Sequence, residues 1–241
     1  MDFSNIVILT GAGVSAESGL GTFRDKTGIW TQYDLEDVAT PEGFRRNPRL
    51  VLDFYNKRRR DMIKSAPNAA HDALARLEQA LSQAGGQFTL VTQNVDNLHE
   101  RAGSRSVVHM HCELGSALCA NCEWRGEWMV DMEHQTQCPQ CGPDGTIRPD
   151  VVWFGEMPYH MERIYETLAA CDLFVSIGTS GAVYPAADFV REAQEVGART
   201  MELNLEPSAN AHVFHSYAYG PASLVVTEWA DEIIAALGAS G

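Results

Sequence analysis

The sequence predicts an α/β fold with a doubly wound parallel sheet, into which a smaller module is inserted. Short apolar runs rich in β-branched residues alternate with segments of helical periodicity, a pattern typical of a parallel sheet covered on both faces. The apolar runs predict strands at residues 6–10, 88–92, 107–111, 173–178, 199–204 and 224–227. Helical periodicity predicts helices at 70–81, 161–170, 186–196 and 229–237.

Two stretches interrupt this alternation. Residues 27–66 look mainly helical, and residues 112–149 contain four cysteines in two CxxC pairs. We therefore expect a Rossmann-like dinucleotide-binding domain made of residues 1–26, 67–111 and 150–241. The helical insertion and the cysteine-rich insertion are expected to form a small domain.

Composition and charge narrow the classes of function. The 241 residues have a formal net charge of −14, which opposes binding to nucleic acid because phosphate contacts need a surplus of Lys and Arg. No apolar run approaches the roughly 20 residues of a membrane-spanning helix, and the amino terminus lacks the basic segment of a secretion signal. We expect a cytoplasmic monomer that binds basic peptides and neither nucleic acid nor membranes.

A glycine turn follows the first predicted strand directly. Residues 11–16 read GAGVSA and fit G-x-G-x-x-G/A, so that backbone amides at a helix start could meet a pyrophosphate. The glycines could instead serve only to let strand and helix pack closely. A dehydrogenase would carry a second strand with an acidic ribose ligand soon afterwards, but residues 28–44 are not strand-like. The best acidic candidate is Glu206, just after the strand predicted at 199–204.

The two CxxC pairs predict a zinc ribbon. Residues 123–137 separate the pairs, a spacing at which four thiolates can close a tetrahedral zinc site, and the ligands would be Cys119, Cys122, Cys138 and Cys141. Two disulfides or a redox CxxC are the alternatives, but cysteines without a secretion signal favour reduced thiols and metal. Four sulfur ligands leave no position for water, so the zinc should be structural. Cys171 should be a buried, small hydrophobic residue.

Five sequence blocks resemble the sirtuin family of NAD-consuming protein deacylases. They are GAGVSAESGLGTFRD at 11–25, TQNVDNLHERAG at 92–103, VVWFGE at 151–156, GTS at 178–180 and NLEPS at 204–208, in the family's order and at compatible spacing. The resemblance spans nearly the whole chain. It implies NAD as a co-substrate, one structural zinc ion, and acylated-lysine peptides or proteins as partners.

The resemblance also implies which residues form the NAD site. Asn94 and Asp96 would hold the glycosidic bond ready to break, and Arg24 with Phe23 would order a loop over the nicotinamide. The same residues around 94 could instead only cap the turn into the next helix. The residues expected to bind NAD are Gly11, Ala12, Gly13, Ser15, Glu17, Phe23, Arg24, Trp30, Gln93, Asn94, Asp96, Gly178, Thr179, Ser180, Asn204, Glu206 and Ala222.

Two histidines alternate on the strand predicted at 107–111 and so should point the same way. Either could act as a base, because imidazole titrates near neutral pH. By resemblance to the family, His111 is the catalytic base, His109 is structural, and His99 packs or caps. The implied reaction joins the acyl oxygen to C1′ of the nicotinamide ribose and releases nicotinamide. The ribose 2′-oxygen then attacks the acyl carbon, and water releases free lysine and 2′-O-acyl-ADP-ribose.

The substrate residues are also expected from the resemblance. The peptide would lie extended beside Val152, Phe154 and Glu156, although this block could be no more than a buried strand end. Tyr55 and Arg58 share a helix face and could receive a carboxylate. Basic neighbours at 57, 59 and 60 would also suit a solvated face. The resemblance favours the pocket, because Tyr-x-x-Arg on this helix marks the desuccinylase and demalonylase branch, which also deacetylates.

One position departs from the family pattern. Cys112 stands where the family has glycine after its catalytic histidine, a position that suggests permissive backbone dihedrals or a close approach to ligand. The side chain could slow turnover, crowd the acyl tunnel, or be tolerated. Two other functions stay open. One is an NAD-dependent peptide-binding module whose activity Cys112 has weakened, and the other is an ADP-ribosyltransferase that uses the same NAD cleavage.

Overall fold

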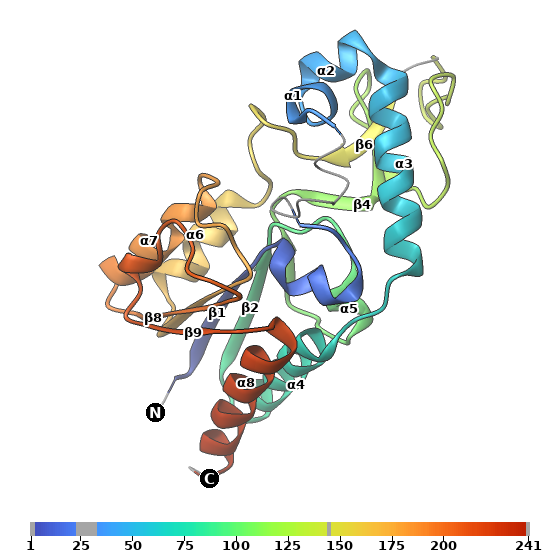
Figure 1. Ribbon diagram of the computed structural model, residues 1–241. Helices are drawn as coiled ribbons and strands as arrows, with labels where there is room; N and C mark the ends of the chain where they lie inside the picture. Colours follow the sequence, from blue (N-terminus) through green and yellow to red (C-terminus); the bar gives the residue numbers. More distant parts are fainter. Residues whose placement is uncertain (1–2, 23–32, 144–145, 240–241) are drawn as a thin grey trace.

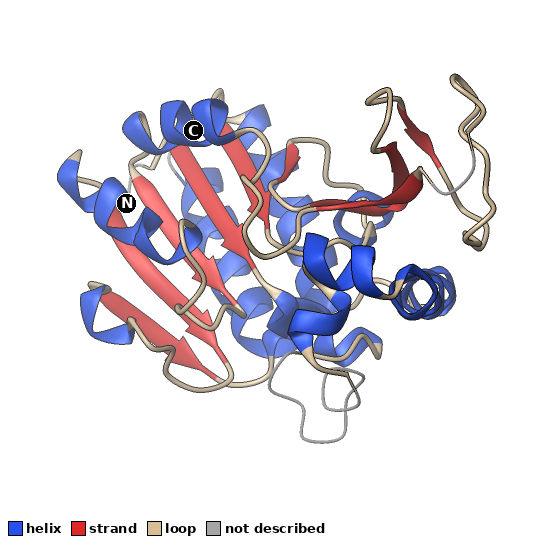
Figure 2. Ribbon diagram, turned by 90° about the horizontal axis from the view of Figure 1, so that it is seen from above, coloured by secondary structure: helices blue, strands red, loops and turns tan. Residues whose placement is uncertain are grey.

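The computed structural model describes residues 3–22, 33–143 and 146–239 (Figure 1). Within these residues a six-stranded sheet is flanked by helices, and a separate three-stranded sheet lies beside the long helix α3 (Pro48–Lys64) (Figures 1 and 2). No helix in the described ranges is long and apolar enough to cross a membrane.

The larger sheet is parallel throughout and confirms the predicted doubly wound, Rossmann-like fold. In spatial order its strands are β3 (Val107–His109), β2 (Gln87–Thr92), β1 (Asn5–Thr10), β7 (Leu173–Ile177), β8 (Arg199–Asn204) and β9 (Ser216–Tyr219). The strand order reverses between β1 and β7. Open sheets of this kind bind ligands at that reversal, outside the carboxyl ends of the strands.

Both faces of this sheet are covered, which explains the continuous apolar run in its central strand β1. In β1, Ile6 and Ile8 pack in the cluster with α4 (Ala69–Gln83) and α8 (Ala222–Ala239). Val7 and Leu9 pack in the cluster with α6 (Met161–Ala169) and α7 (Phe189–Glu195). All four side chains are at most 3% exposed. These four helices, which are labelled in Figure 1, cover the two faces of the sheet.

The strand predicted at 224–227 is wrong, because these residues lie inside α8. The buried side chains of this helix are Val226, Trp229, Ala230 and Ile233, a spacing of i, i+3, i+4 and i+7 that places them on one helix face. Helical amphipathicity therefore outweighs the β-branched Val pair. The sixth strand is instead β9, an edge strand whose short polar and aromatic sequence, SYAY, carries no apolar run.

Two other predicted elements are shorter than expected. The strand predicted at 107–111 ends at His109, and residues 110–111 form a turn into the second sheet. The helix predicted at 186–196 is divided into a 3₁₀ turn (Ala186–Asp188) and α7. His109 and His111 therefore do not share one strand, and the argument that they point the same way is wrong.

The small domain combines helices with an antiparallel sheet. The helices are α1 (Leu35–Val38), α2 (Pro41–Arg46) and α3, and the strands, in spatial order, are β5 (Arg125–Glu127), β4 (Cys112–Cys119) and β6 (Ile147–Val151). The helical character predicted for residues 27–66 is confirmed at 35–64, and residues 27–32 lie outside the described ranges. Pairing of β6 with β4 continues to Val151, beyond the boundary predicted at 149. The division into domains is still a prediction.

Candidate active site

A cavity of about 1140 Å³ opens at the carboxyl ends of β1, β2, β7 and β8 and reaches α3 and the loop after β6. Every predicted catalytic, NAD-binding and substrate residue that the structure describes lines it: Gly11, Ala12, Gly13, Ser15, Glu17, Tyr55, Arg58, Gln93, Asn94, Asp96, His111, Val152, Phe154, Glu156, Gly178, Thr179, Ser180, Asn204, Glu206 and Ala222. Phe23, Arg24 and Trp30 lie outside the described residues. Five separate sequence blocks thus meet at one place.

Two glycine loops, one after β1 and one after β7, touch where the strand order reverses. The Gly11 amide donates to the Ile177 carbonyl and the Gly13 amide to the Gly178 carbonyl, both at 2.9 Å. A Cβ on Gly13 would lie 2.7 Å from Gly178 Cα. These two amides are therefore used within the protein, and close packing is one real reason for the glycines. The segment after the turn is a 3₁₀ helix (Ala12–Ser18), and its contact with a pyrophosphate is still a prediction.

Ser15 joins Asn94 and Asp96 beside these loops. Its Oγ accepts a hydrogen bond from Asn94 Nδ2 at 3.2 Å and donates one to Asp96 Oδ2 at 3.1 Å. Asp96 Oδ1 accepts the amide of Leu98 at 3.1 Å, so the carboxylate also caps the turn into α5 (Leu98–Arg101). Burial raises the pKa of Asp96, although both of these bonds oppose the rise. Capping and a role in the site are compatible, because different carboxylate oxygens serve them.

His111 is positioned by a backbone carbonyl. Its Nδ1 lies 2.9 Å from the Gln93 carbonyl oxygen. A carbonyl only accepts, so Nδ1 carries the proton and Nε2 is left as the basic atom. Burial lowers the pKa of His111, and the bond to Gln93 opposes that effect only in part. The side chain therefore borders the cavity as a neutral imidazole at neutral pH, the form that a general base needs.

The other two histidines predicted in this region have partners that suit structural roles. His109 Nε2 lies 2.7 Å from Glu100 Oε1. Burial lowers the pKa of His109, but the bond and charge of Glu100 outweigh it and raise the pKa overall. His99 is fully buried and its Nε2 lies 3.0 Å from Thr10 Oγ1, which agrees with the packing role predicted for it.

Hydrogen bonds also connect the elements that line the cavity near β8 and the start of α8. Glu17 accepts both the amide and the hydroxyl of Ser223 at 2.8 Å, which ties the 3₁₀ helix to the start of α8. Asn204 Nδ2 donates to the Thr179 carbonyl at 2.8 Å, which links the ends of β8 and β7. Glu206 is exposed at this side of the cavity. Its binding to ribose is still a prediction.

Tyr55 and Arg58 lie side by side on the face of α3 that borders the cavity. The Arg58 guanidinium carbon lies 5.9 Å from the centroid of the Tyr55 ring. Burial lowers the pKa of Arg58, and the charges of Tyr55 and Asp96 oppose this. The alternative of a solvated basic face is wrong at Arg59, which is 1% exposed and donates its Nε hydrogen to the Leu114 carbonyl at 2.7 Å.

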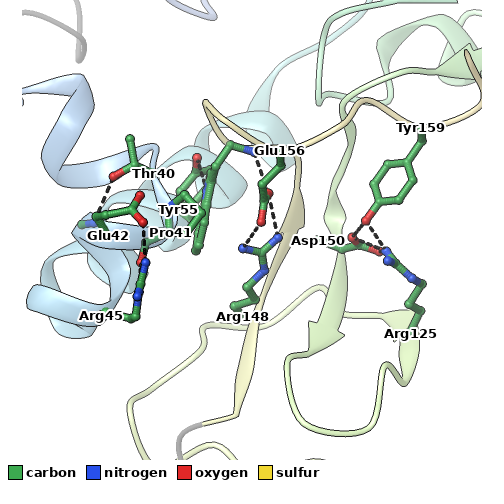
Figure 3. A network of polar contacts seen from close by, with 12 residues as sticks. Thr40, Pro41, Glu42, Arg45, Tyr55, Arg125, Arg148, Asp150, Glu156 and Tyr159 are labelled. Atoms are coloured by element: carbon green, nitrogen blue, oxygen red, sulfur yellow. Dashed lines mark hydrogen bonds and ion pairs between the residues drawn. The ribbon is translucent and has the colours of Figure 1, made fainter.

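The segment after β6 also lines the cavity. The Val152 amide donates to the His111 carbonyl at 3.1 Å, so this wall is tied directly to the histidine turn. Phe154 is 48% exposed, and the interpretation as a buried strand end applies only up to Val151. Glu156 forms two short contacts with the Arg148 guanidinium, at 2.9 and 3.0 Å (Figure 3).

The four paired cysteines lie together, as zinc binding requires. Their sulfur atoms are all within 4.8 Å of one another, with Cys119 3.7 Å from Cys141 and Cys122 3.6 Å from Cys138. A tetrahedral site with Zn–S bonds of about 2.3 Å places sulfurs roughly 3.8 Å apart. The residues therefore fit one zinc ion, and none of them forms a disulfide. Cys171 is 5% exposed, which confirms its prediction as a buried residue, although it follows α6 and does not lie on it.

Cys112 has the backbone conformation that its glycine-like position predicts. Its φ is +58°, in the left-handed region that glycine adopts without strain. Burial, and next the charge of Asp150, raise the pKa of the thiol to about 12, so it is not a reactive thiolate. Asp150 in turn binds Arg125 at 2.5 Å and the Tyr159 hydroxyl at 3.0 Å (Figure 3).

Comparison with known proteins agrees with this arrangement. A model of the Sir2 family matches residues 11–185. The chain belongs to the Sir2 family. This confirms the resemblance to sirtuins. The Sir2 chain is 58% identical over 232 residues to a protein of Caulobacter vibrioides named NAD-dependent protein deacylase, covering 96% of this chain and 98% of that one. It is 51% identical over 241 residues to an Escherichia coli protein of the same name, covering 99% and 85%.

Solved structures show the same similarity. A Sir2 homologue in complex with NAD superposes with a TM-score of 0.89 at 36% identity, covering 98% of this chain and 91% of that one. A Sir2 protein bound to acetylated peptide superposes with a TM-score of 0.80 at 26% identity, covering 98% and 94%. The Sir2 chain thus shares its whole fold with proteins solved with NAD and with peptide.

Sequence reasoning missed three residues of this Sir2 site. His71 caps α4 by accepting the Asn68 amide on Nδ1, and its Nε2 lies 3.4 Å from Ser15 Oγ. Trp153 lies between Val152 and Phe154, and its Nε1 donates to the Tyr55 hydroxyl at 2.9 Å. Arg148 holds Glu156. The Trp inside the VVWFGE block was a signal, but its partner on α3 could not be read from spacing.

Proposed function

We propose that this Sir2 protein is an NAD-dependent protein-lysine deacylase that prefers succinyl, malonyl and related acidic acyl groups to acetyl. Deacylation is supported by the family and by full-length similarity to proteins named NAD-dependent protein deacylase. One observation carries the acyl preference: Tyr55 and Arg58 lie together on the wall of the cavity that also contains His111. A guanidinium and a phenol are suitable partners for a carboxylate.

The protein's residues divide the work of the reaction. When bound, NAD supplies the nicotinamide–ribose bond that breaks and the ribose hydroxyls that accept the acyl group. Asn94 and Asp96, which Ser15 holds by hydrogen bonds, orient the ribose. His111 accepts a proton from a ribose hydroxyl at Nε2, because Nδ1 is occupied by the Gln93 carbonyl. The loops at 11–13 and 178–180 lie where strand order reverses and would hold the phosphates.

The substrate lysine enters between the wall at 152–156 and the loop after β7. Peptide main-chain pairing with this wall tolerates many sequences, and the net charge of −14 favours basic peptides. Arg58 receives the terminal carboxylate of a succinyl or malonyl group. The four cysteines would hold a structural zinc ion that has no part in the chemistry. Cytoplasmic location and a monomeric state are still predictions.

Three versions of one peptide test the proposal: succinyl-lysine, malonyl-lysine and acetyl-lysine, each with and without NAD. We expect nicotinamide release only with peptide and NAD together, and a higher kcat/KM for succinyl than for acetyl. Arg58→Met should abolish that preference and spare deacetylation, because it removes the cation that binds the carboxylate. Equal losses on the succinyl and acetyl peptides would rule out the acidic-acyl pocket. Label transferred from NAD to protein would indicate an ADP-ribosyltransferase, and binding without turnover a binding module.

A further inference from the structure

The Tyr55 hydroxyl has a defined direction in this cavity. Trp153 Nε1 lies 2.9 Å from the Tyr55 oxygen, and both side chains are at most 2% exposed. An indole N–H can only donate, so the Tyr55 oxygen is the acceptor of this bond. The phenolic proton is not used in it and is available to a second partner. Burial raises the pKa of Tyr55 to about 12, so the hydroxyl keeps that proton at neutral pH.

The indole that sets this direction is itself fixed by an ion pair. The Arg148 guanidinium carbon lies 4.0 Å from the centroid of the Trp153 ring, a cation–π contact. Arg148 forms two contacts with Glu156, and Glu156 Oε2 accepts the Trp153 amide at 2.9 Å. Arg148, Glu156 and Trp153 therefore form a closed ring of contacts (Figure 3 shows the Arg148–Glu156 pair). Rotation of the indole would break its contact with the Arg148 guanidinium and its hydrogen bond to the Tyr55 oxygen.

The same ion pair also sets the charge beside the pocket. Glu156 lines the cavity, and an unpaired carboxylate there would repel an acidic acyl group. Arg148, whose side chain is 10% exposed, pairs with it through both guanidinium nitrogens. The positive charges of Arg58 and Arg148 and the negative charge of Glu156 all act on the Tyr55 hydroxyl. Because two positive charges and one negative charge surround this hydroxyl, the local field favours a carboxylate as the acceptor of the Tyr55 proton.

We infer that Trp153 is a specificity-determining residue: its indole N–H, held by the Arg148–Glu156 pair, directs the Tyr55 hydroxyl proton toward the acyl carboxylate of the substrate. The inference rests on the proposed preference for acidic acyl groups. Trp153 is a positioning residue, because it acts through Tyr55 and does not itself contact the acyl group. Its bond to Tyr55 joins the loop after β6 to α3, and both elements contribute residues to the lining of the cavity.

A double-mutant cycle tests the inference with four proteins: the parent, Trp153→Phe, Tyr55→Phe and the double variant. Phe keeps an aromatic ring beside Arg148 but removes the N–H donor. We expect Trp153→Phe to lower kcat/KM for a succinyl-lysine peptide about tenfold, and at least fivefold more than for the acetyl-lysine peptide. In the Tyr55→Phe background the succinyl-specific effect should vanish. Equal losses on both peptides, or the same succinyl loss in both backgrounds, would overturn the inference.

Trp128→Phe is the matched control, because the buried Trp128 N–H has no partner among the described residues. It should change the ratio of the two kcat/KM values by less than twofold, and a larger change would count against the inference. If Trp153→Phe does not fold, the inference is tested by the NMR signals of the indole N–H groups in the ¹⁵N-labelled parent protein. The signal that Tyr55→Phe shifts should move further with succinyl-lysine peptide than with acetyl-lysine peptide, and equal shifts overturn the inference.

The Arg58→Met variant separates failure of this inference from failure of the proposed function. If Arg58→Met removes the succinyl preference and Trp153→Phe does not, the proposed function stands and the inference alone fails. If the parent protein shows no succinyl preference, the proposed acyl pocket fails and the inference fails with it.

Discussion

His111 Nδ1 lies 2.9 Å from the carbonyl oxygen of Gln93, the residue that directly follows β2. This bond makes the position of the imidazole depend on the central sheet, although His111 itself lies in a turn outside it. It also selects the tautomer with a free Nε2. The predicted base and the polar residues Asn94 and Asp96 are therefore oriented by one short segment of backbone.

The first prediction concerns pH. Burial lowers the pKa of His111 below its ordinary value of 6.5, so the neutral base persists to lower pH than for an exposed histidine. We expect kcat/KM for the acetyl-lysine peptide, which carries no acyl carboxylate to titrate, to fall only as pH drops through an apparent pKa below 6.5. His111→Asn should reduce kcat/KM by roughly 10²- to 10⁴-fold. The exposed His134→Asn is the control, and an unchanged rate in His111→Asn would contradict the assignment.

A second prediction concerns Cys112. Its φ of +58° costs a side-chain-bearing residue roughly 1 kcal/mol, and the Cys112→Gly change removes that cost. Loss of the half-buried thiol offsets part of the gain, so we expect Tm to rise by about 1–3 °C. Cys112 is not among the described residues that line the cavity, so we expect the kcat/KM of Cys112→Gly to stay within twofold of the parent value.

Glu123→Gly is the matched control for this change, because Glu123 has a φ of +59° in the zinc module, away from the cavity. It should raise Tm similarly and leave kinetics alone. Calorimetry and steady-state assays measure both effects. A rise in kcat/KM above fivefold in Cys112→Gly alone would show that the cysteine obstructs turnover.

A third prediction concerns the buried Asp150 carboxylate. Its side chain is 3% exposed and pairs with Arg125, whose own side chain is 43% exposed. Arg125→Met would leave a buried charge without its main partner, which we expect to lower the free energy of unfolding by about 2 kcal/mol after allowance for solvent around Arg125. The exposed Arg60–Asp131 pair offers the comparison, since Arg60→Met should cost about 0–1 kcal/mol. Urea unfolding measures both, and equal costs would contradict the prediction.

A fourth prediction concerns zinc. The four sulfur atoms belong to a cluster in which Cys119 and Cys138 pack with Leu52 of α3 and with Ile147 of β6. Removing the metal should therefore loosen the small domain, including α3 with Tyr55 and Arg58. We expect one zinc ion per chain in the parent protein by elemental analysis, and loss of zinc and of deacylation in Cys138→Ala. Cys171→Ala should keep both, and full activity of metal-free protein would contradict a structural zinc.

The correct sequence predictions depended on local patterns. In β1 the four residues from Ile6 to Leu9 are all apolar because both faces of the strand are buried, and this run is visible without knowing what covers it. The zinc ligands follow from the spacing of two CxxC pairs. The run at 224–227 misled, because it satisfies a strand pattern over four residues, whereas the buried positions from Val226 to Ile233 follow a helix pattern over eight. β3 ends at His109 because the chain turns there toward the three-stranded sheet. No local sequence pattern predicts the position of that turn.

From the sequence by itself, periodicity predicted the doubly wound fold and motif spacing predicted the cluster of four cysteines, because both patterns express burial and ligand geometry within short segments. The residues expected around the cavity came from the resemblance to the sirtuin family. Only the tertiary structure decided how those residues meet. The bond between Trp153 and Tyr55 joins residues 98 positions apart, and His111 is oriented by a carbonyl 18 positions away. Such contacts depend on the packing of whole elements, and hydrogen-bond direction is set only once both partners are in place.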